Sequence, residues 1–243
     1  MRIELQAFDS GRLAPRVGVV HLSADEDVNE EQILERSRAD RFDLVSLSLP
    51  DLRPLRLFRH VGTLLEHVGM VADLADRLAG LRSAGEVRNV VATDWPNVEA
   101  LVAVAPPNRF GRDPRLAPSA VRRHKVDMLR TYAGHHPEHT LVSTEGGAVV
   151  GLQLSWPRGE DIVLYELMTE PGPAQAFRAI GLLRENVRRL RRDAPAAERV
   201  VAWIYEHNTR SLAFFAGLGM HPTGRASFHH HLWPERDLDL RGT

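Results

Sequence analysis

The chain has 243 residues, no cysteine, 31 lysine and arginine residues against 32 acidic ones, and a formal net charge of −1. Its length fits one large domain or two small ones and suffices for a buried core. The lack of cysteine excludes disulfides, thiolate metal sites and a cysteine nucleophile. The balanced charge argues against a surface built wholly for nucleic acid. No apolar run reaches the roughly 18–20 residues of a membrane span, and MRIELQAFDSGR has no hydrophobic leader, so we expect a cytoplasmic protein.

Short strand-like runs alternate with helical segments, which predicts an α/β or α+β layered fold. In the first part of the chain we expect strands and helices in turn, at 17–22, 25–40, 42–49 and 54–69. The segment 54–69 is assigned to a helix because its apolar residues recur at helical spacing and Gly69 can cap its end. The segment 70–81 fits either a strand or a helix. The small polar stretch 82–86 is the predicted linker, which gives an N-terminal αβ lobe at 1–84 and a second domain at 85–243.

The second domain is predicted to run strand, helix, helix, three antiparallel strands, helix, strand, helix, strand. The expected ranges are 87–93, 94–105, 119–134, 139–144, 148–156, 161–169, 173–193, 199–206, 209–218 and 226–233. Glu145-Gly146-Gly147 predicts a tight hairpin between the first two antiparallel strands.

Near the C-terminus Asn208 is followed by Ser211, by the pair Phe214-Phe215 and by Gly219-Met220. Asn208 can cap the helix that starts at Thr209. This spacing, together with the element order, resembles the motif of the GNAT superfamily of N-acyltransferases. The segments FDSGRLAPRVGVVHL and NRFGRDPRLAPSAVRRHKVDMLRTYAG are similar to two-lobed enzymes of the TDP-fucosamine acetyltransferase type.

The resemblance implies a GNAT fold, with a mixed central sheet flanked by helices, preceded by a smaller, degenerate GNAT-like αβ lobe. It implies an acetyl-CoA or other acyl-CoA donor and a small-molecule amine acceptor such as a nucleotide amino sugar. A homodimer is compatible with it, and no membrane partner or metal is expected.

The donor would lie after the fourth strand of the family, where backbone N–H groups and a helix N-terminus approach the pyrophosphate. Here the region reads TEPGPAQAFRAIGLL, which departs from the family's glycine-rich pattern, and Pro171 and Pro173 remove two N–H donors. The residues that the resemblance assigns to donor binding are Met168, Gly172, Gln175, Arg178, Asn208, Ser211 and Phe215.

The candidate base is Glu166, because an acid inside an apolar strand is costly unless it is paired or used. The alternative interpretation is a hydrogen-bonded interior carboxylate or a solvent-facing position. Many family members have a tyrosine at the position of Phe215, and its hydroxyl protonates the leaving thiolate. Without it, Tyr205, His207 or His221, the nearest in sequence, could serve as the acid, the leaving group could need little help, or the fold no longer transfers acyl groups from CoA.

His230 lies in the histidine run of the last predicted strand and faces away from His229 and His231. It is a candidate acid or base if it lines a cleft. The alternative is an exposed histidine on an edge strand. We assign no metal site to this run or to the group His135, His136 and His139.

The helix at 173–193 carries an arginine run, which usually marks a solvated face. It could also meet a CoA phosphate, an acyl-carrier protein or a tRNA. Lys125 is the only lysine of the chain, and lysine chemistry is not expected. The leading hypothesis is N-acyl transfer from an acyl-CoA. The alternatives are a GNAT-fold protein with a carrier-protein or aminoacyl-tRNA donor, and a protein that has lost acyl transfer.

Overall fold

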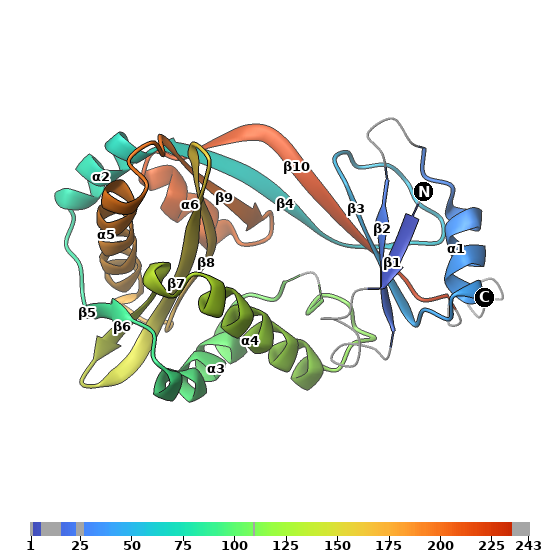
Figure 1. The fold of residues 1–243 in the computed structure, drawn as a ribbon, viewed down its shortest axis with the longest axis horizontal. Coiled ribbons are helices and arrows are strands. Elements are labelled where there is room, and N and C mark those ends of the chain that lie inside the picture. Colours follow the sequence, from blue (N-terminus) through green and yellow to red (C-terminus); the bar gives the residue numbers. More distant parts are fainter. Residues whose placement is uncertain (1, 6–15, 23–26, 109, 235–243) are drawn as a thin grey trace. The chain divides into compact units, whose positions relative to one another are not determined.

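The computed structural model describes residues 2–5, 16–22, 27–108 and 110–234 (Figure 1). The chain forms two compact units, each assembled from segments that are distant in sequence. Unit 1 comprises residues 1–64, 107–124 and 226–243, and unit 2 comprises 65–106 and 125–225. These units differ from the expected ranges 1–84 and 85–243, because single helices and strands contribute residues to both.

Unit 1 contains β1–β3, α1 and one part each of β4, α4 and β10. Its strand order is β1-β2-β3-β10-β4. Strands β2 and β3 are parallel, whereas β1 is antiparallel to β2 and β10 is antiparallel to β3. The elements are β1 (Arg2–Leu5), β2 (Val17–His21), α1 (Glu30–Ala39), β3 (Leu44–Leu49), β4 (Arg59–Met70), α4 (Pro118–His135) and β10 (His221–Leu232).

Helix α1 begins later than expected. The side chain of Asn29 accepts a hydrogen bond from the Gln32 N–H at 3.0 Å and so caps the helix. Glu30 and Glu31 follow in the first turn, which suits the helix dipole. The expected start at Asp25 was therefore too early, and residues 25 and 26 lie outside the described residues.

Unit 2 contains the remaining elements together with the other parts of β4, α4 and β10. Its strand order is β10-β4-β9-β8-β7-β6-β5. Strands β5 to β8 pair antiparallel, and β8 pairs parallel with β9, so the predicted order of three antiparallel strands, helix and strand is confirmed. The elements are α2 (Val71–Ala79), β5 (Glu86–Asn89), a 3-10 turn (Ala92–Asp94), α3 (Trp95–Val104), a 3-10 turn (Pro137–His139), β6 (Thr140–Glu145), β7 (Ala148–Arg158), β8 (Asp161–Thr169), α5 (Gln175–Asp193), β9 (Arg199–Tyr205) and α6 (Thr209–Gly217).

The helix expected at 54–69 was wrong: this segment is the long strand β4. In unit 2 the strand lies between β9 and β10, where its peptide groups join a sheet. Gly69 fits this close packing, because a Cβ there would come within 2.8 Å of the Cγ of Met220. Sheet pairing with strands far along the chain outweighs the helical spacing of the leucines. The ambiguous segment that follows is the helix α2.

Two hydrophobic clusters cover the opposite faces of the unit 2 sheet. One joins α2, α5 and α6 to side chains of β8 and β9, including Leu164, Ala202 and Ile204. The other joins α3 and α4 to side chains of β6, β7 and β8, including Leu152 and Met168. We call these the α5 face and the α4 face. In the described part of the chain, no helix is both long and apolar enough to cross a membrane.

Candidate functional site

Strands β8 and β9 separate part-way along their length. Their parallel ladder runs from the pair Asp161–Arg199 to the pair Leu164–Ala202. Beyond it β8 continues to Thr169 and β9 to Tyr205. Each strand therefore has peptide groups past the last pair that do not join this ladder. Such groups can pair with the amides of a ligand, because every backbone N–H and C=O needs a partner.

A β-bulge lies at the start of this separation. Leu154 of β7 pairs with Glu166 and the next residue, Ser155, pairs with Leu164, so Tyr165 is the extra residue. Tyr165 and Glu166 are neighbours in sequence, yet both reach helix α4. The Tyr165 hydroxyl donates to the sulfur of Met128 at 2.9 Å. The bulge thus turns Glu166 toward the α4 face.

Glu166 is paired with Lys125 of α4. The Lys125 Nζ lies 3.4 Å from Oε1 and 3.3 Å from Oε2, and the two side chains are 10% and 20% exposed. Glu166 is thus a paired carboxylate that retains some access to solvent. The pairing of Lys125 with Glu166 was not expected from the sequence. The signal for Lys125 was its place four residues after Val121 and four before Leu129, on the buried stripe of α4.

Tyr205 ends β9, and His207 and Asn208 follow it. The rings of Tyr205 and His207 lie 5.3 Å apart, and both residues are half-buried. The Asn208 side chain accepts from the Ser211 N–H at 3.2 Å, which confirms the predicted cap of α6. Because β8 and β9 are parallel, their carboxyl ends, and hence Glu166 and Tyr205, lie toward the same end of the sheet.

The segment after β8 turns at Gly172, whose φ is +146°, a value that favours glycine. Helix α5 begins at Gln175, whose N–H donates to the Gly172 carbonyl at 3.1 Å. The preceding Ala174 provides no side-chain cap. The first turn of α5 therefore resembles the expected donor loop in its place in the fold.

The strand ladder that opens past Leu164, the bulge and the order of elements together define a known fold. The structure aligns with a tandem GNAT protein from the clavulanic acid biosynthesis pathway at a TM-score of 0.57 and 12% identity, over 90% of this chain and 75% of that one. It aligns with a GCN5-related N-acetyltransferase from Sphaerobacter thermophilus at 0.55 and 14%, over 96% and 75%.

The chain has the GNAT fold. A conserved protein of unknown function from Staphylococcus epidermidis also aligns, at a TM-score of 0.59 and 12% identity over 90% of this chain and 84% of that one. No protein-family model and no curated protein matches the sequence.

Arg178, the expected phosphate ligand of this GNAT fold, is bound by carboxylates. Its Nε and Nη2 donate to the two oxygens of Glu145 at 2.9 and 2.7 Å, and its Nη1 lies 3.5 Å from Oε2 of Glu170. The hydrogen bonds from Arg178 also lower the pKa of Glu145. A donor phosphate would have to displace Glu145 before Arg178 could bind it.

Other arginines of α5 also have partners in the chain. Arg184 donates to the last carbonyl groups of α2 and to the following segment. The pairs are Arg184 with Leu78, Leu81 and Ser83, Arg188 and Arg189 with Glu185, and Arg192 with Asp193. Each of these arginines is therefore held by a partner in the protein, and Glu185 and Asp193 balance part of their charge.

Two of the expected donor-binding residues are core residues. Phe215 is 5% exposed and packs in the cluster of the α5 face. Met168 is also 5% exposed and packs in the cluster of the α4 face. Only the main chain of Met168, on the separated part of β8, is placed to meet a ligand.

His230 belongs to unit 1, unlike the other candidate residues. The alternative interpretation of His230, an exposed histidine on an edge strand, was wrong, since His230 is 2% exposed and β10 lies between β3 and β4. Burial, with a smaller contribution from His60 at a ring distance of 5.0 Å, lowers the pKa of His230 to about 4. The imidazole is therefore neutral at neutral pH.

The histidines on either side of His230 are buried as well, and they bond to other partners. His229 Nδ1 lies 2.8 Å from the Ser48 hydroxyl, and His231 Nδ1 lies 2.9 Å from a carboxylate oxygen of Asp113. Among the described residues, no group of three or more histidine, aspartate or glutamate side chains is placed to hold a metal ion.

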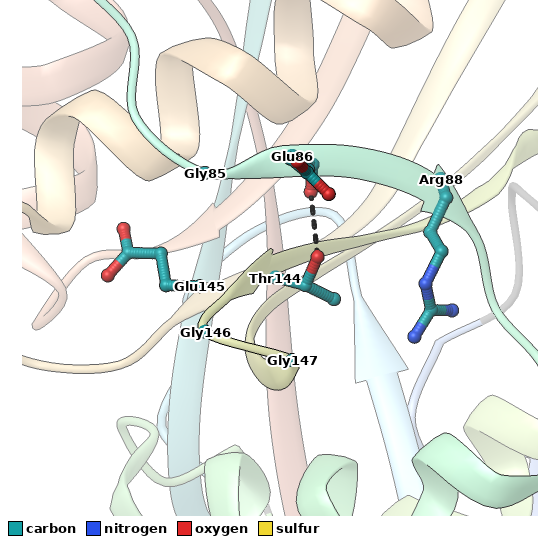
Figure 2. A pocket seen from close by; sticks show the side chains of 7 residues that line it. All are labelled: Gly85, Glu86, Arg88, Thr144, Glu145, Gly146 and Gly147. Atoms are coloured by element: carbon teal, nitrogen blue, oxygen red, sulfur yellow. Dashed lines mark hydrogen bonds between the residues drawn. The ribbon is translucent and has the colours of Figure 1, made fainter.

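A pocket of about 620 Å³ lies apart from these residues, at the edge of the unit 2 sheet. It is lined by β5 and by the hairpin between β6 and β7 (Figure 2). Glu145 and Arg88 lie at opposite ends of it, and each is paired, with Arg178 and with Asp94. The pocket contacts the donor loop only through Glu145, the partner of Arg178, and its lining contains none of the predicted catalytic residues.

Proposed function

We propose that the chain is an N-acyltransferase that moves an acyl group from a thioester, acetyl-CoA or another acyl-CoA, to the amine of a small polar metabolite such as a nucleotide amino sugar. The observation that carries the proposal is the separation of β8 from β9 directly beside the bulge that turns Glu166. The separated strand edge, which can bind the amides of an extended ligand, thus lies next to the carboxylate of Glu166.

The donor would lie along the separated part of β8. Residues 165–169 offer peptide N–H and C=O groups past the end of the β8–β9 ladder, and the amides of a pantetheine arm have matching donors and acceptors. An N–H group pointed at the thioester oxygen would stabilise the negative charge that develops there. Main-chain pairing of this kind also orients the carbonyl for attack.

The acceptor amine must lose a proton as it attacks. Glu166 would accept this proton, directly or through a water molecule, while Lys125 keeps the carboxylate in one orientation. A C–N bond forms and the C–S bond breaks. The leaving thiolate takes a proton from Tyr205, the last residue of β9, or from His207, whose ring lies 5.3 Å from that of Tyr205.

A second candidate keeps the chemistry and changes the donor. The neutralised Arg178 and the two prolines beside Gly172 favour a donor without free nucleotide phosphates at this loop. An acyl-carrier protein or an aminoacyl-tRNA would present such a thioester or ester.

Calorimetry with acetyl-CoA and with S-acetylpantetheine separates these donors. Equal affinity for both would favour the second candidate, tighter binding of acetyl-CoA would favour the first, and no heat from either at millimolar concentration would contradict thioester binding. The chain contains no cysteine, so thiol release can be followed with a disulfide reagent without background from the protein.

Turnover tests Glu166 separately. We expect Glu166→Gln to retain donor binding and to lose about 10²–10⁴-fold in amine-dependent thiol release. Glu206→Gln is the matched control, because Glu206 is an exposed glutamate next to Tyr205. Unchanged turnover in Glu166→Gln would remove Glu166 from the mechanism.

A further inference from the structure

A second charged cluster lies in unit 2, and its charged residues, Glu66 of β4 and Arg225 of β10, have no role in the proposed acyl transfer. Glu66 of β4 is 6% exposed, yet it carries a carboxylate. Oε2 of Glu66 accepts a hydrogen bond from the Thr223 hydroxyl at 2.8 Å, and Oε1 lies 3.1 Å from Nη1 of Arg225. The Arg225 guanidinium also lies over the indole ring of Trp203, 5.9 Å from its centre.

The backbone positions Arg225 as well. Gly224 has a φ of +83°, which turns β10 just before the arginine. The Arg225 N–H donates to the Thr223 hydroxyl oxygen at 3.2 Å. The residue is therefore held by its main chain, by a carboxylate and by an aromatic face.

This cluster lies on the same face of the sheet as Glu166. Ala202 and Ile204 of β9 point to the α5 face, and side chains alternate along a strand, so Trp203 points to the α4 face. Glu166 points there too, because its partner Lys125 belongs to α4.

Trp203 lies on β9, the strand next to β8, whereas Glu66 lies on β4 and Arg225 on β10, one and two strands further along the sheet. β9 lies between β4 and β8, and neighbouring strands of a sheet are about 5 Å apart. Trp203 directly follows Ala202, the last β9 residue in the ladder with β8. Trp203 therefore borders the separated part of β8 and β9, and Arg225 reaches this place by lying over the indole ring.

Arg225 is the exposed member of its ion pair with the buried Glu66. The Glu66 side chain is 7% exposed, whereas the Arg225 side chain is 73% exposed. Both hydrogen bonds to the carboxylate come from Nη1, so in an arginine side chain this exposed the other N–H groups of the fork are open to a ligand. A fixed guanidinium of this kind suits two-point binding of a carboxylate or a phosphate.

We propose that Arg225 binds an anionic group, a carboxylate or a phosphate, on the amine that Glu166 deprotonates. The acceptor is then an amine with a negative charge elsewhere in the molecule. That the ligand is an amine rests on the proposed function. That it carries an anionic group rests on the cluster of Glu66, Trp203 and Arg225.

The experiment compares pairs of amines in which one member carries an anionic group and the other does not. Glucosamine 6-phosphate is compared with glucosamine, and glycine with glycinamide, so the phosphate and carboxylate sources are tested separately. We expect wild type to prefer at least one anionic member by 10-fold or more in kcat/KM. Arg225→Gln is expected to abolish that preference through KM and to leave the neutral amines unchanged.

Two further variants keep the test interpretable. Arg130→Gln is the matched control, because Arg130 also lies over an indole, that of Trp95, at 5.3 Å. If Arg225→Gln alone unfolds by leaving Glu66 unpaired, the double variant Glu66→Gln/Arg225→Gln removes both charges. It is expected to fold and still to lack the preference.

Binding of the same four amines without donor, measured by calorimetry, separates the two proposals. Binding of an anionic amine that depends on Arg225, without any thiol release, contradicts acyl transfer and supports the anion site. Thiol release with equal kcat/KM for charged and neutral amines overturns the anion site and leaves acyl transfer standing. If Arg225→Gln lowers kcat/KM equally for charged and neutral amines, the anion site is also overturned, because a purely structural role of Arg225 would give this result.

Discussion

The Nζ atom of Lys125 lies 3.3 Å from Oε2 and 3.4 Å from Oε1 of Glu166, so the only lysine of the chain holds the carboxylate of the β8 bulge. Lys125→Met would leave that carboxylate partly buried without its donor. We expect it to lower the free energy of unfolding by about 1–3 kcal/mol and to lower kcat without weakening donor binding. Urea denaturation, calorimetry and thiol release measure the three quantities.

Lys125→Arg is the control for this pair, because it keeps a positive donor beside Glu166. It should retain more turnover than Lys125→Met. Equal turnover in both variants, at wild-type level, would mean that the pair serves packing alone.

The Arg178–Glu145 pair predicts an effect on donor choice. Glu145→Gln leaves Arg178 with a neutral partner in place of the bidentate carboxylate. If the loop meets phosphates, affinity for acetyl-CoA should rise several-fold while affinity for S-acetylpantetheine stays constant. A parallel change for both donors, or none for either, would place the donor phosphates away from Arg178.

The buried position of Phe215 predicts the outcome of restoring a tyrosine. Phe215→Tyr would place a hydroxyl in the cluster of the α5 face, where the wild-type ring is 5% exposed. We expect a loss of about 1–3 kcal/mol in the free energy of unfolding and no gain in thiol release. Phe214→Tyr, at the half-buried neighbouring position, should cost less. A faster reaction in Phe215→Tyr would show that the hydroxyl reaches the thiolate.

The buried His230 predicts a pH-dependent stability. The unfolded chain protonates this histidine near pH 6.5, whereas burial in the folded protein lowers its pKa to about 4. Between these values the unfolded state binds more protons, so stability falls as the pH falls from 6.5 toward 4. The contribution of this group is about 3 kcal/mol over the whole window.

Urea unfolding at several pH values checks this contribution. His230→Leu should lose stability less steeply than wild type between pH 6.5 and 4.5. His221→Leu changes an exposed histidine of the same strand and should follow the wild-type slope. Parallel slopes for wild type and His230→Leu would show that His230 does not titrate in this window.

Much of the second half of the fold follows from local sequence. The strands and helices from residue 118 onward follow the predicted order, because turns such as Glu145-Gly146-Gly147 and the cap at Asn208 act on neighbouring residues. The motif around Asn208 and Phe215, together with the order of the elements, indicated the GNAT fold. Glu166 stood out because a carboxylate in an apolar strand needs a partner.

The tertiary structure decided what depends on residues far apart in the chain. It made residues 59–70 a strand, because pairing with distant strands outweighs helical periodicity. It supplied Lys125 as the partner of Glu166, from 41 residues away, and bound Arg178 to Glu145. It also brought Glu66 to Arg225 across 159 residues. The length of the chain allowed one domain or two, and the structure shows two compact units, each assembled from segments distant in sequence, because two strands and a helix contribute residues to both units.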